Sequence, residues 1–135
     1  ITLLDSVLFE VNRAELTADG IAFLERFIPI YGKTLFQDQS VSDEITRIII
    51  EGHTSSDGTT EHNMSLSLRR ANSVFDFINR FDFLQRTVLV DKIQVSGRGY
   101  LDANHTASLP EDRKVIFRMQ FKSDEAFGRF LKELN

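Results

Sequence analysis

Two hydrophobic periods alternate along this chain, one of two residues and one of about 3.6, which predicts strands interleaved with helices. A short apolar run at residues 7–9 indicates an edge strand, and a loop follows at 12–16. The β-branched run at 45–50 is typical of a buried strand. Alternating patterns at 93–95 and 115–121 predict two more strands. The last of these places four apolar side chains on one face: Val115, Phe117, Met119 and Phe121.

Helical spacing dominates two long stretches. Thr17 fits the N-cap of a helix that begins immediately after it, and Pro29 and Gly32 predict that this helix kinks or ends early. A second helix is predicted at about 61–81. The apolar positions of the first helix are Ile21, Leu24, Ile28 and Leu35.

Polar segments separate these elements. The stretch 81–91 is ambiguous and fits one further helical turn, and 126–134 fits a short terminal helix. The resulting order, β-α-β-α-β-β-α, predicts a single domain over residues 1–135 with an α/β (α+β) sandwich fold, in which helices cover one face of a single mixed sheet. Loops are predicted between the other elements, at 37–43, 52–58 and 102–111.

The helix at 61–81 carries three classes of side chain. On a helical wheel, its broad apolar face contains Met64, Leu68, Ala71, Val74, Phe75 and Ile78. The opposite, solvent-facing side contains Ser65, Arg69, Asn72, Asp76 and Arg80. Beside the apolar face lie Asn63, Leu66 and Arg70. Arg70 therefore places a permanent charge near the protein body, where a guanidinium needs an anion or several carbonyl groups.

Two kinds of partner are open for Arg70. An internal carboxylate, from Asp57 or Glu61, would fix the glycine-bounded loop at 52–58. Alternatively, a ligand carboxylate would bridge Arg70 and the backbone N–H groups of the loop and the helix start. Periodicity alone favours the internal, structural partner.

Composition narrows the class of protein. The chain has 135 residues, of which 41% are hydrophobic and 27% charged, as expected for one globular domain with a real core. Its net charge of -4 argues against nucleic acid as a partner. Without cysteine, disulfides, thiolate metal sites and cysteine nucleophiles are excluded. No apolar run is long enough to span a membrane, and no signal peptide is present. We therefore expect any membrane anchor upstream of this sequence, which starts with Ile.

The candidate catalytic and metal-binding groups form no familiar pattern. His53, His62 and His105 are too scattered for a metal site, and His53 fits a strand-end residue that is hydrogen-bonded to the following loop. Ser65 and Ser67 lack a nucleophile-elbow motif, and the sequence lacks the Gly-Lys-Ser/Thr of a phosphate loop. We expect no enzymatic activity, no metal and no organic cofactor.

A set of motifs follows one order along the chain. The principal one is Ile-Ile-Ile-Glu-Gly-His-Thr at 48–54, followed by Gly58, Asn63, Leu-Ser-Leu-Arg-Arg-Ala at 66–71, and Val74. Flanking matches are Phe9-Glu-Val-Asn12, Gly97-Arg-Gly-Tyr100 and Asp112-Arg-Lys-Val115. In order and spacing these motifs, over about residues 7–121, resemble the OmpA-like peptidoglycan-binding domains. That family includes the OmpA C-terminal domain, the Pal lipoproteins and the MotB subunit of flagellar stators.

The resemblance implies a non-catalytic module that binds peptidoglycan in the periplasm. Such a module anchors an envelope protein or a stator-type, MotB-like membrane protein to the cell wall. Members of the family bind the stem peptide, chiefly its diaminopimelate, with an Asp for the ammonium and an Arg for the carboxylate. The arginine at the matching position is Arg70. Other matching positions, the last of them a weaker match, are Thr54, Asn63, Leu66, Arg113 and Asn12.

One position departs from the family pattern, because the acidic residue after Gly-His-Thr is Ser55 here. A serine can accept a hydrogen bond from an ammonium but carries no charge, and the nearest carboxylate is that of Asp57. Either Asp57 substitutes, or the site binds weakly, or the ligand is a variant. The departure also motivates an alternative function, an OmpA-like dimerisation or protein-interaction domain that has lost ligand binding. Stator-type members of the family pair through this domain, so a homodimer is compatible with the resemblance.

A narrower resemblance concerns the last predicted strand and the pair Asp57-Gly58. These residues are similar to those of ZorB, the MotB-like subunit of Zorya anti-phage systems. The similarity implies the wall-anchoring part of a proton-driven membrane motor, and thus a role in anti-phage defence.

Overall fold

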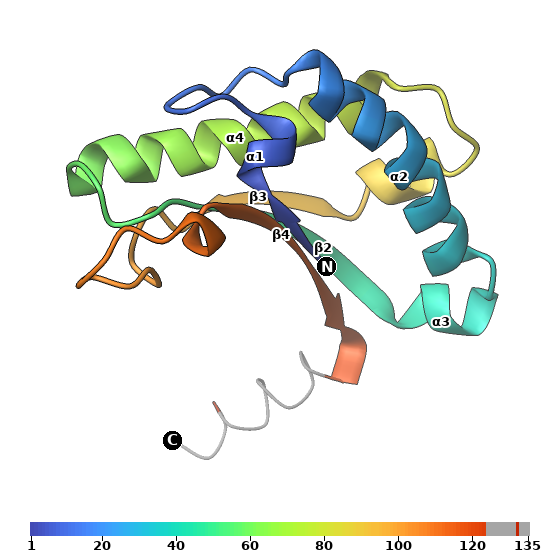
Figure 1. Ribbon diagram of the computed structural model, residues 1–135. Helices are drawn as coiled ribbons and strands as arrows, with labels where there is room; N and C mark the ends of the chain where they lie inside the picture. Colours follow the sequence, from blue (N-terminus) through green and yellow to red (C-terminus); the bar gives the residue numbers. More distant parts are fainter. Residues whose placement is uncertain (124–131, 133–135) are drawn as a thin grey trace.

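The computed structural model describes residues 1–123 and 132, and in it a four-stranded mixed sheet forms one layer of the molecule (Figure 1). The strand order is β1-β4-β2-β3, with β2 parallel to β3 and antiparallel to β4. Because β1 is also antiparallel to β4, the C-terminal ends of β1, β2 and β3 and the N-terminal end of β4 meet at one edge of the sheet. The strands are β1 (Thr2–Leu4), β2 (Ile45–His53), β3 (Ile93–Gly97) and β4 (Lys114–Phe121).

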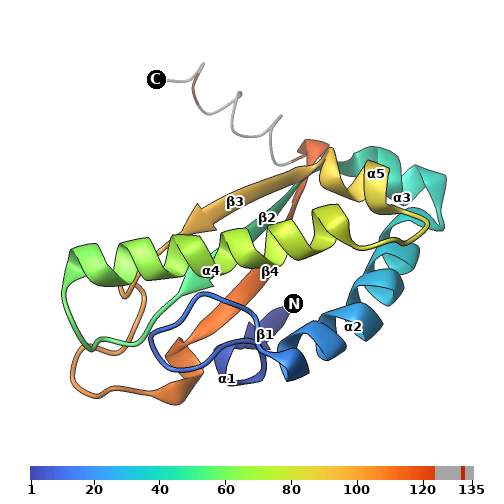
Figure 2. The same cartoon turned by 90° about the horizontal axis from the view of Figure 1, so that it is seen from above.

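Helices form the second layer, and the two long ones, α2 and α4, lie across the same face of the sheet (Figures 1 and 2). The predicted α/β sandwich with helices on one face is therefore confirmed. The terminal helix expected at 126–134 lies outside the described residues. The helices are α1 (Asp5–Leu8), α2 (Ala18–Phe36), α3 (Gln39–Glu44), α4 (Thr60–Arg80) and α5 (Arg86–Val90), with a 3-10 turn at Pro110–Asp112.

Three of the four strand predictions are confirmed, and the first is wrong. The edge strand is β1 at Thr2–Leu4, not the apolar run at 7–9. That run instead ends α1 and buries Leu8 and Phe9 in the core, where Phe9 forms only an isolated bridge with Leu16. The apolar residues at this point are thus used to fill the core rather than to extend the sheet.

The first long helix continues past Pro29 and Gly32. Thr17 caps α2 as expected, since its Oγ1 accepts a hydrogen bond of 2.9 Å from the Gly20 N–H. The predicted early end is wrong, because α2 runs through Pro29 to Phe36. Proline removes one hydrogen bond from the helix, and burial of an apolar stripe against the sheet offsets that loss. The buried stripe comprises Leu24, Ile28, Tyr31 and Leu35.

Two segments between the long elements also differ from the prediction. The polar stretch at 37–43 is not a loop, because it contains most of α3, which Asp38 caps by accepting a hydrogen bond of 3.0 Å from the Ser40 N–H. Short polar residues serve well as caps, so a polar run can begin a helix as readily as it can form a loop. The ambiguous stretch at 81–91 contains the single turn of α5.

The backbone of α4 packs directly on the sheet at Ser67. A Cβ atom on Gly52 of β2 would lie 2.1 Å from the Ser67 carbonyl oxygen, and one on Gly97 of β3 would lie 2.8 Å from the Leu68 nitrogen. This contact rotates α4 relative to the predicted wheel, so Ser67 is fully buried whereas Leu68 is exposed. The buried face consists of Asn63, Leu66, Ser67, Arg70, Ala71, Val74 and Ile78.

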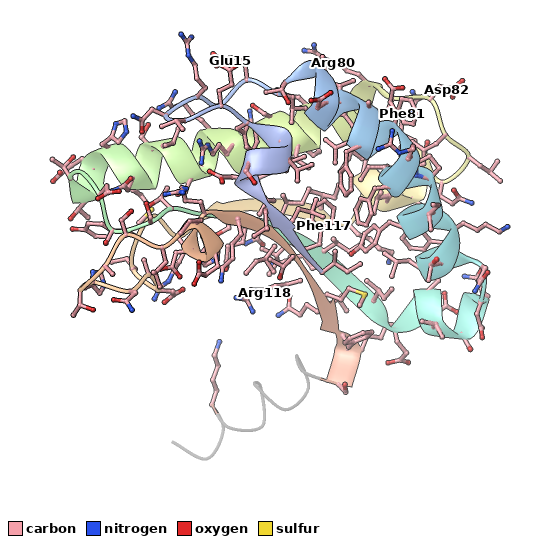
Figure 3. All side chains as sticks on the ribbon, in the orientation of Figure 1. Glu15, Arg80, Phe81, Asp82, Phe117 and Arg118 are labelled. Carbon is pink, nitrogen blue, oxygen red and sulfur yellow. The ribbon has the colours of Figure 1, made fainter. Side chains whose placement is uncertain are left out.

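An aromatic cluster joins α2 to the sheet. The Tyr31 ring meets the Phe117 ring edge-on, with 5.2 Å between centroids, and stacks on Phe27. Phe117 and its neighbour Arg118 point to opposite faces of β4 (Figure 3). Within the described part of the chain, the buried Tyr31 hydroxyl has no hydrogen-bond partner. Desolvation by this burial raises the pKa of Tyr31 to about 12.

We predict that Gly52→Ala destabilises the fold by roughly 3 kcal/mol, because the added methyl group collides with backbone rather than with a movable side chain. Urea unfolding measures the loss. Gly32→Ala is the matched control, since its new Cβ meets only the side chains of Gln85 and Phe83 at 3.3 Å and removes a flexible glycine from a helix. Equal losses in the two variants would contradict the close contact between α4 and β2.

We predict that Tyr31→Phe is at least as stable as the parent chain at pH 7, because it removes a buried hydroxyl that lacks a partner. The raised pKa also makes stability depend on pH. In the folded state the phenol stays neutral to about pH 12, whereas in the unfolded chain it ionises near pH 10. The parent should therefore lose roughly 2–3 kcal/mol between pH 10 and 12 relative to the Phe variant. If the free energies of unfolding of the parent and of the Phe variant change equally between pH 10 and 12, the Tyr31 phenol is not desolvated.

Candidate ligand-binding cleft

A cleft of about 900 Å³ opens beside the sheet edge where β2 ends and β4 begins. Its walls come from three segments that are distant in sequence: residues 4–12, the loop and helix at 54–70, and residues 110–113. The structure brings all eight residues of the predicted site to this one cleft. They are Asn12, Thr54, Ser55, Asp57, Asn63, Leu66, Arg70 and Arg113.

Arg70 lies at the base of the cleft, with its side chain 3% exposed. Its Nη1 donates to Asp5 Oδ2 at 2.5 Å, its Nε to the Arg13 carbonyl at 2.8 Å, and its Nη2 to the Glu10 carbonyl at 3.1 Å. The guanidinium also lies 5.1 Å from the centroid of the Phe9 ring. Burial lowers the pKa of Arg70, and the Asp5 carboxylate acts in the opposite direction.

The internal partner of Arg70 is therefore Asp5, and the candidates Asp57 and Glu61 were wrong. The misplaced first strand hid this contact, because Asp5 lies directly after β1 and its backbone N–H donates to the Arg113 carbonyl. One signal was present in the sequence: Asp5 is the single charged side chain in the mostly apolar start of the chain, at residues 1–9. An acid in such a run indicates a buried cationic partner.

Arg113, Ser55 and Thr54 form the second polar group of the cleft. Arg113 keeps 34% of its side chain exposed, and its Nε lies 3.9 Å from Asp5 Oδ1. Its Nη1 donates to Ser55 Oγ at 3.3 Å. The neighbouring Thr54 is buried, and among the described residues its Oγ1 has no hydrogen-bond partner. A buried hydroxyl without a partner beside an open cleft is a natural contact for a ligand.

The loop between β2 and α4 is held by side chains of the same site. Asn63 Nδ2 donates to the Asp57 carbonyl at 2.6 Å, which closes the loop around Gly58, whose φ is +87°. The Asp57 carboxylate, which also lines the cleft, accepts from Ser108 Oγ at 2.5 Å through Oδ2. Asn63 thus shapes the cleft wall, and one oxygen of Asp57 already has a partner within the protein.

Polar groups on the other face of the sheet form a separate network. His53 does end β2 as predicted, but its Nε2 lies 2.7 Å from Glu51 Oε1 rather than bonding to the loop. Arg118 Nη2 donates to the same Glu51 oxygen at 3.2 Å. Across residues 1–123 and 132, no cluster of His, Cys, Asp or Glu has the composition to hold a metal ion. In the same part of the chain, no helix is long and apolar enough to cross a membrane.

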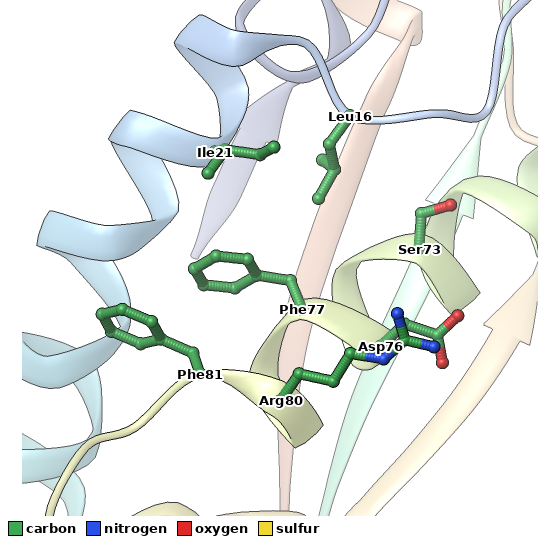
Figure 4. Close-up of a pocket in the computed structure, with 7 residues that line it drawn as sticks. All are labelled: Leu16, Ile21, Ser73, Asp76, Phe77, Arg80 and Phe81. Carbon is green, nitrogen blue, oxygen red and sulfur yellow. The ribbon is translucent and has the colours of Figure 1, made fainter.

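A second, shallower groove of about 430 Å³ lies in the helical layer (Figure 4). Phe77 of α4 and Phe81, the residue that follows this helix, face Leu16 and Ile21 across it. Asp76, Arg80 and Ser73, also from α4, complete the lining.

The fold and the cleft define a small α/β sandwich domain with a cleft at the sheet edge where β2 ends and β4 begins. The chain belongs to the OmpA family, whose model matches residues 8–116. Outer membrane protein A of Escherichia coli O157:H7 is 32% identical over 98 residues, or 73% of this chain, and that of Serratia marcescens is 29% identical over 102 residues. The chain spans about a quarter of the length of each of these two relatives.

Solved structures share the fold at lower identity. The periplasmic domain of Helicobacter pylori MotB (its residues 97–256) superposes with a TM-score of 0.66 and 13% identity, covering 99% of this chain and 87% of that one. The peptidoglycan-associated lipoprotein of Burkholderia pseudomallei superposes with a TM-score of 0.55 and 19% identity, covering 88% and 89%.

We predict that Arg70→Ala destabilises the domain by roughly 3–5 kcal/mol, because it leaves the Asp5 carboxylate buried without its close partner. Arg98→Ala serves as the control, since it breaks the exposed Arg98–Asp102 pair of 2.9 Å and should change stability little. Urea unfolding compares the two variants. If Arg70→Ala lowers the free energy of unfolding no more than Arg98→Ala does, the buried Arg70–Asp5 pair does not stabilise the fold.

Proposed function

We propose that this domain is a non-catalytic peptidoglycan-binding module. The observation that carries the proposal is the convergence of Arg70, Arg113 and the Thr54 hydroxyl on one cleft in a member of the OmpA family. The name of the Burkholderia pseudomallei lipoprotein, a structural neighbour, associates this fold with peptidoglycan. The site offers hydrogen-bond donors and positive charge, which is the chemistry of carboxylate recognition.

The proposed recognition uses the donors that the protein leaves available. A guanidinium has five N–H groups, and three of those of Arg70 bond to partners within the described chain. One N–H on each Nη therefore remains for a carboxylate of the stem peptide, which would form a bidentate pair. Arg113 is the second cation, and a third of its side chain is exposed to the cleft opening or to solvent. Leu66 and Asn12 supply the cleft wall around the peptide.

The wider role follows from this proposal. A module of this kind would hold an envelope protein or a MotB-like stator to the cell wall from the periplasm, with membrane attachment supplied by a segment outside this sequence. The similarity to ZorB and a role in anti-phage defence remain a prediction of the last strand and of Asp57-Gly58.

A second candidate function is self-association through the helical layer. The groove beside α4 is lined by four apolar side chains, and Asp76 and Arg80 lie one turn apart on its rim. A two-fold axis passing between Asp76 and Arg80 would set Asp76 of each copy opposite Arg80 of the other, and such reciprocal pairs are compatible with a self-complementary interface. Sedimentation velocity over a range of concentrations tests this dimer independently of wall binding.

We predict that Arg113→Gln reduces binding to purified peptidoglycan sacculi by roughly tenfold or more, because a charged hydrogen-bond donor leaves the cleft. Co-sedimentation with sacculi measures the binding. The stability of the domain should change little, since this side chain is partly exposed and its closest polar contact is 3.3 Å long.

The matched control is Arg118→Gln, which removes the same charge from an exposed position on the opposite face of the sheet. Arg118 is 53% exposed and does not line the cleft. Equal losses in the two variants would show that net charge, rather than the cleft, governs association with the wall.

A further inference from the structure

The buried part of the cleft carries an excess of positive charge. Two guanidinium groups share one carboxylate there, since Asp5 lies 2.5 Å from Arg70 and 3.9 Å from Arg113. The negative charge of Asp5 is therefore balanced by the protein's own arginines, and it attracts a further positive group only weakly. The remaining buried polar side chains in this part of the cleft, Thr54, Ser55 and Asn63, are uncharged.

The excess positive charge is felt at Ser55, the residue that a ligand nitrogen would approach. Its hydroxyl accepts from the Arg113 guanidinium at 3.3 Å, so a ligand group placed against Ser55 also approaches a full positive charge. An ammonium at that point meets like-charge repulsion and finds only a hydroxyl in return. An amide N–H pays no such penalty, and it can donate to the oxygen of Ser55 or to the unpartnered oxygen of Thr54.

Resting on the proposed peptidoglycan-binding function, we infer that this cleft recognises a carboxylate whose neighbouring nitrogen is acylated, as at the C-terminus of a peptide. A zwitterionic amino-acid centre, which carries a free ammonium beside its carboxylate, is the disfavoured ligand. Arg70 and Arg113 hold the carboxylate, and the hydroxyls of Ser55 and Thr54 accept the amide N–H.

The other carboxylates that line the cleft do not restore an ammonium site. Asp57 accepts a hydrogen bond from Ser108 at 2.5 Å through one of its two oxygens and is exposed. Glu10 and Glu111 are exposed, where water screens their charge and weakens any pair they form. Recognition of an ammonium in the buried part of the cleft would thus lack a partner of opposite charge.

The test compares two probes that differ by acetylation of their two nitrogens, diaminopimelate and N,N′-diacetyl-diaminopimelate, so that the ammonium groups of the first are neutral amides in the second. NMR titration of the 135-residue chain should show at least tenfold tighter binding of the diacetyl compound. Ser55→Asp should reverse this preference, because it places a carboxylate where the ammonium lies. Ser56→Asp is the matched control, since it adds the same charge to the same loop at a residue that does not line the cleft, and it should leave the preference unchanged.

The possible results separate the inference from the function on which it rests. Tighter binding of diaminopimelate by the parent chain overturns the inference, as does reversal by Ser56→Asp as strong as that by Ser55→Asp. Binding of sacculi with neither small probe bound at 10 mM (roughly the concentration that detects millimolar affinity) also overturns it, because the inference assigns recognition to one amino-acid-sized subsite. Failure to bind sacculi as well as both probes would remove the proposed function itself.

Discussion

The buried guanidinium of Arg70 is the constraint around which the functional end of this domain is arranged. An arginine cannot lose its charge, so a position that is almost free of solvent obliges the rest of the chain to supply acceptors. The N-terminal segment supplies them through the carboxylate of Asp5 and the carbonyls of Glu10 and Arg13. One helical residue thereby fixes the path of a segment more than fifty residues away, and that path forms one wall of the cleft.

A second constraint sets the height of α4 above the sheet. Glycines at 52 and 97 let the helix backbone touch the strands at Ser67, whose hydroxyl accepts from the Gly99 N–H and donates to the Met64 carbonyl. Because Arg70 lies one turn further along the same helix, this contact also sets its depth. The loop from 54 to 59 joins the two elements and is closed by Asn63, and Thr54 and Ser55 at its start are buried.

The sequence predicted most of this architecture because the long elements have strong periodicity. The strand at 45–50 and the helix at 61–81 were placed within a few residues, and six residues on or between them that the motifs indicated do line the cleft: Thr54, Ser55, Asp57, Asn63, Leu66 and Arg70. The failures are local and share a cause. The run at 7–9 is apolar because Leu8 and Phe9 are buried in the core. A short hydrophobic pattern does not distinguish a buried non-strand segment of this kind from an edge strand. The misplaced strand in turn concealed Asp5, and no local pattern could pair it with an arginine 65 residues away.

The cleft is built from three segments that touch one another only in the folded chain. Anything that occupies it binds the native state and not the unfolded one, so occupancy and folding form a single equilibrium. By mass action, a ligand present at a hundred times its dissociation constant would raise the free energy of unfolding by about 2.7 kcal/mol. A domain that holds its ligand through such a cleft resists unfolding most strongly while it is attached, and attachment becomes part of its thermal stability.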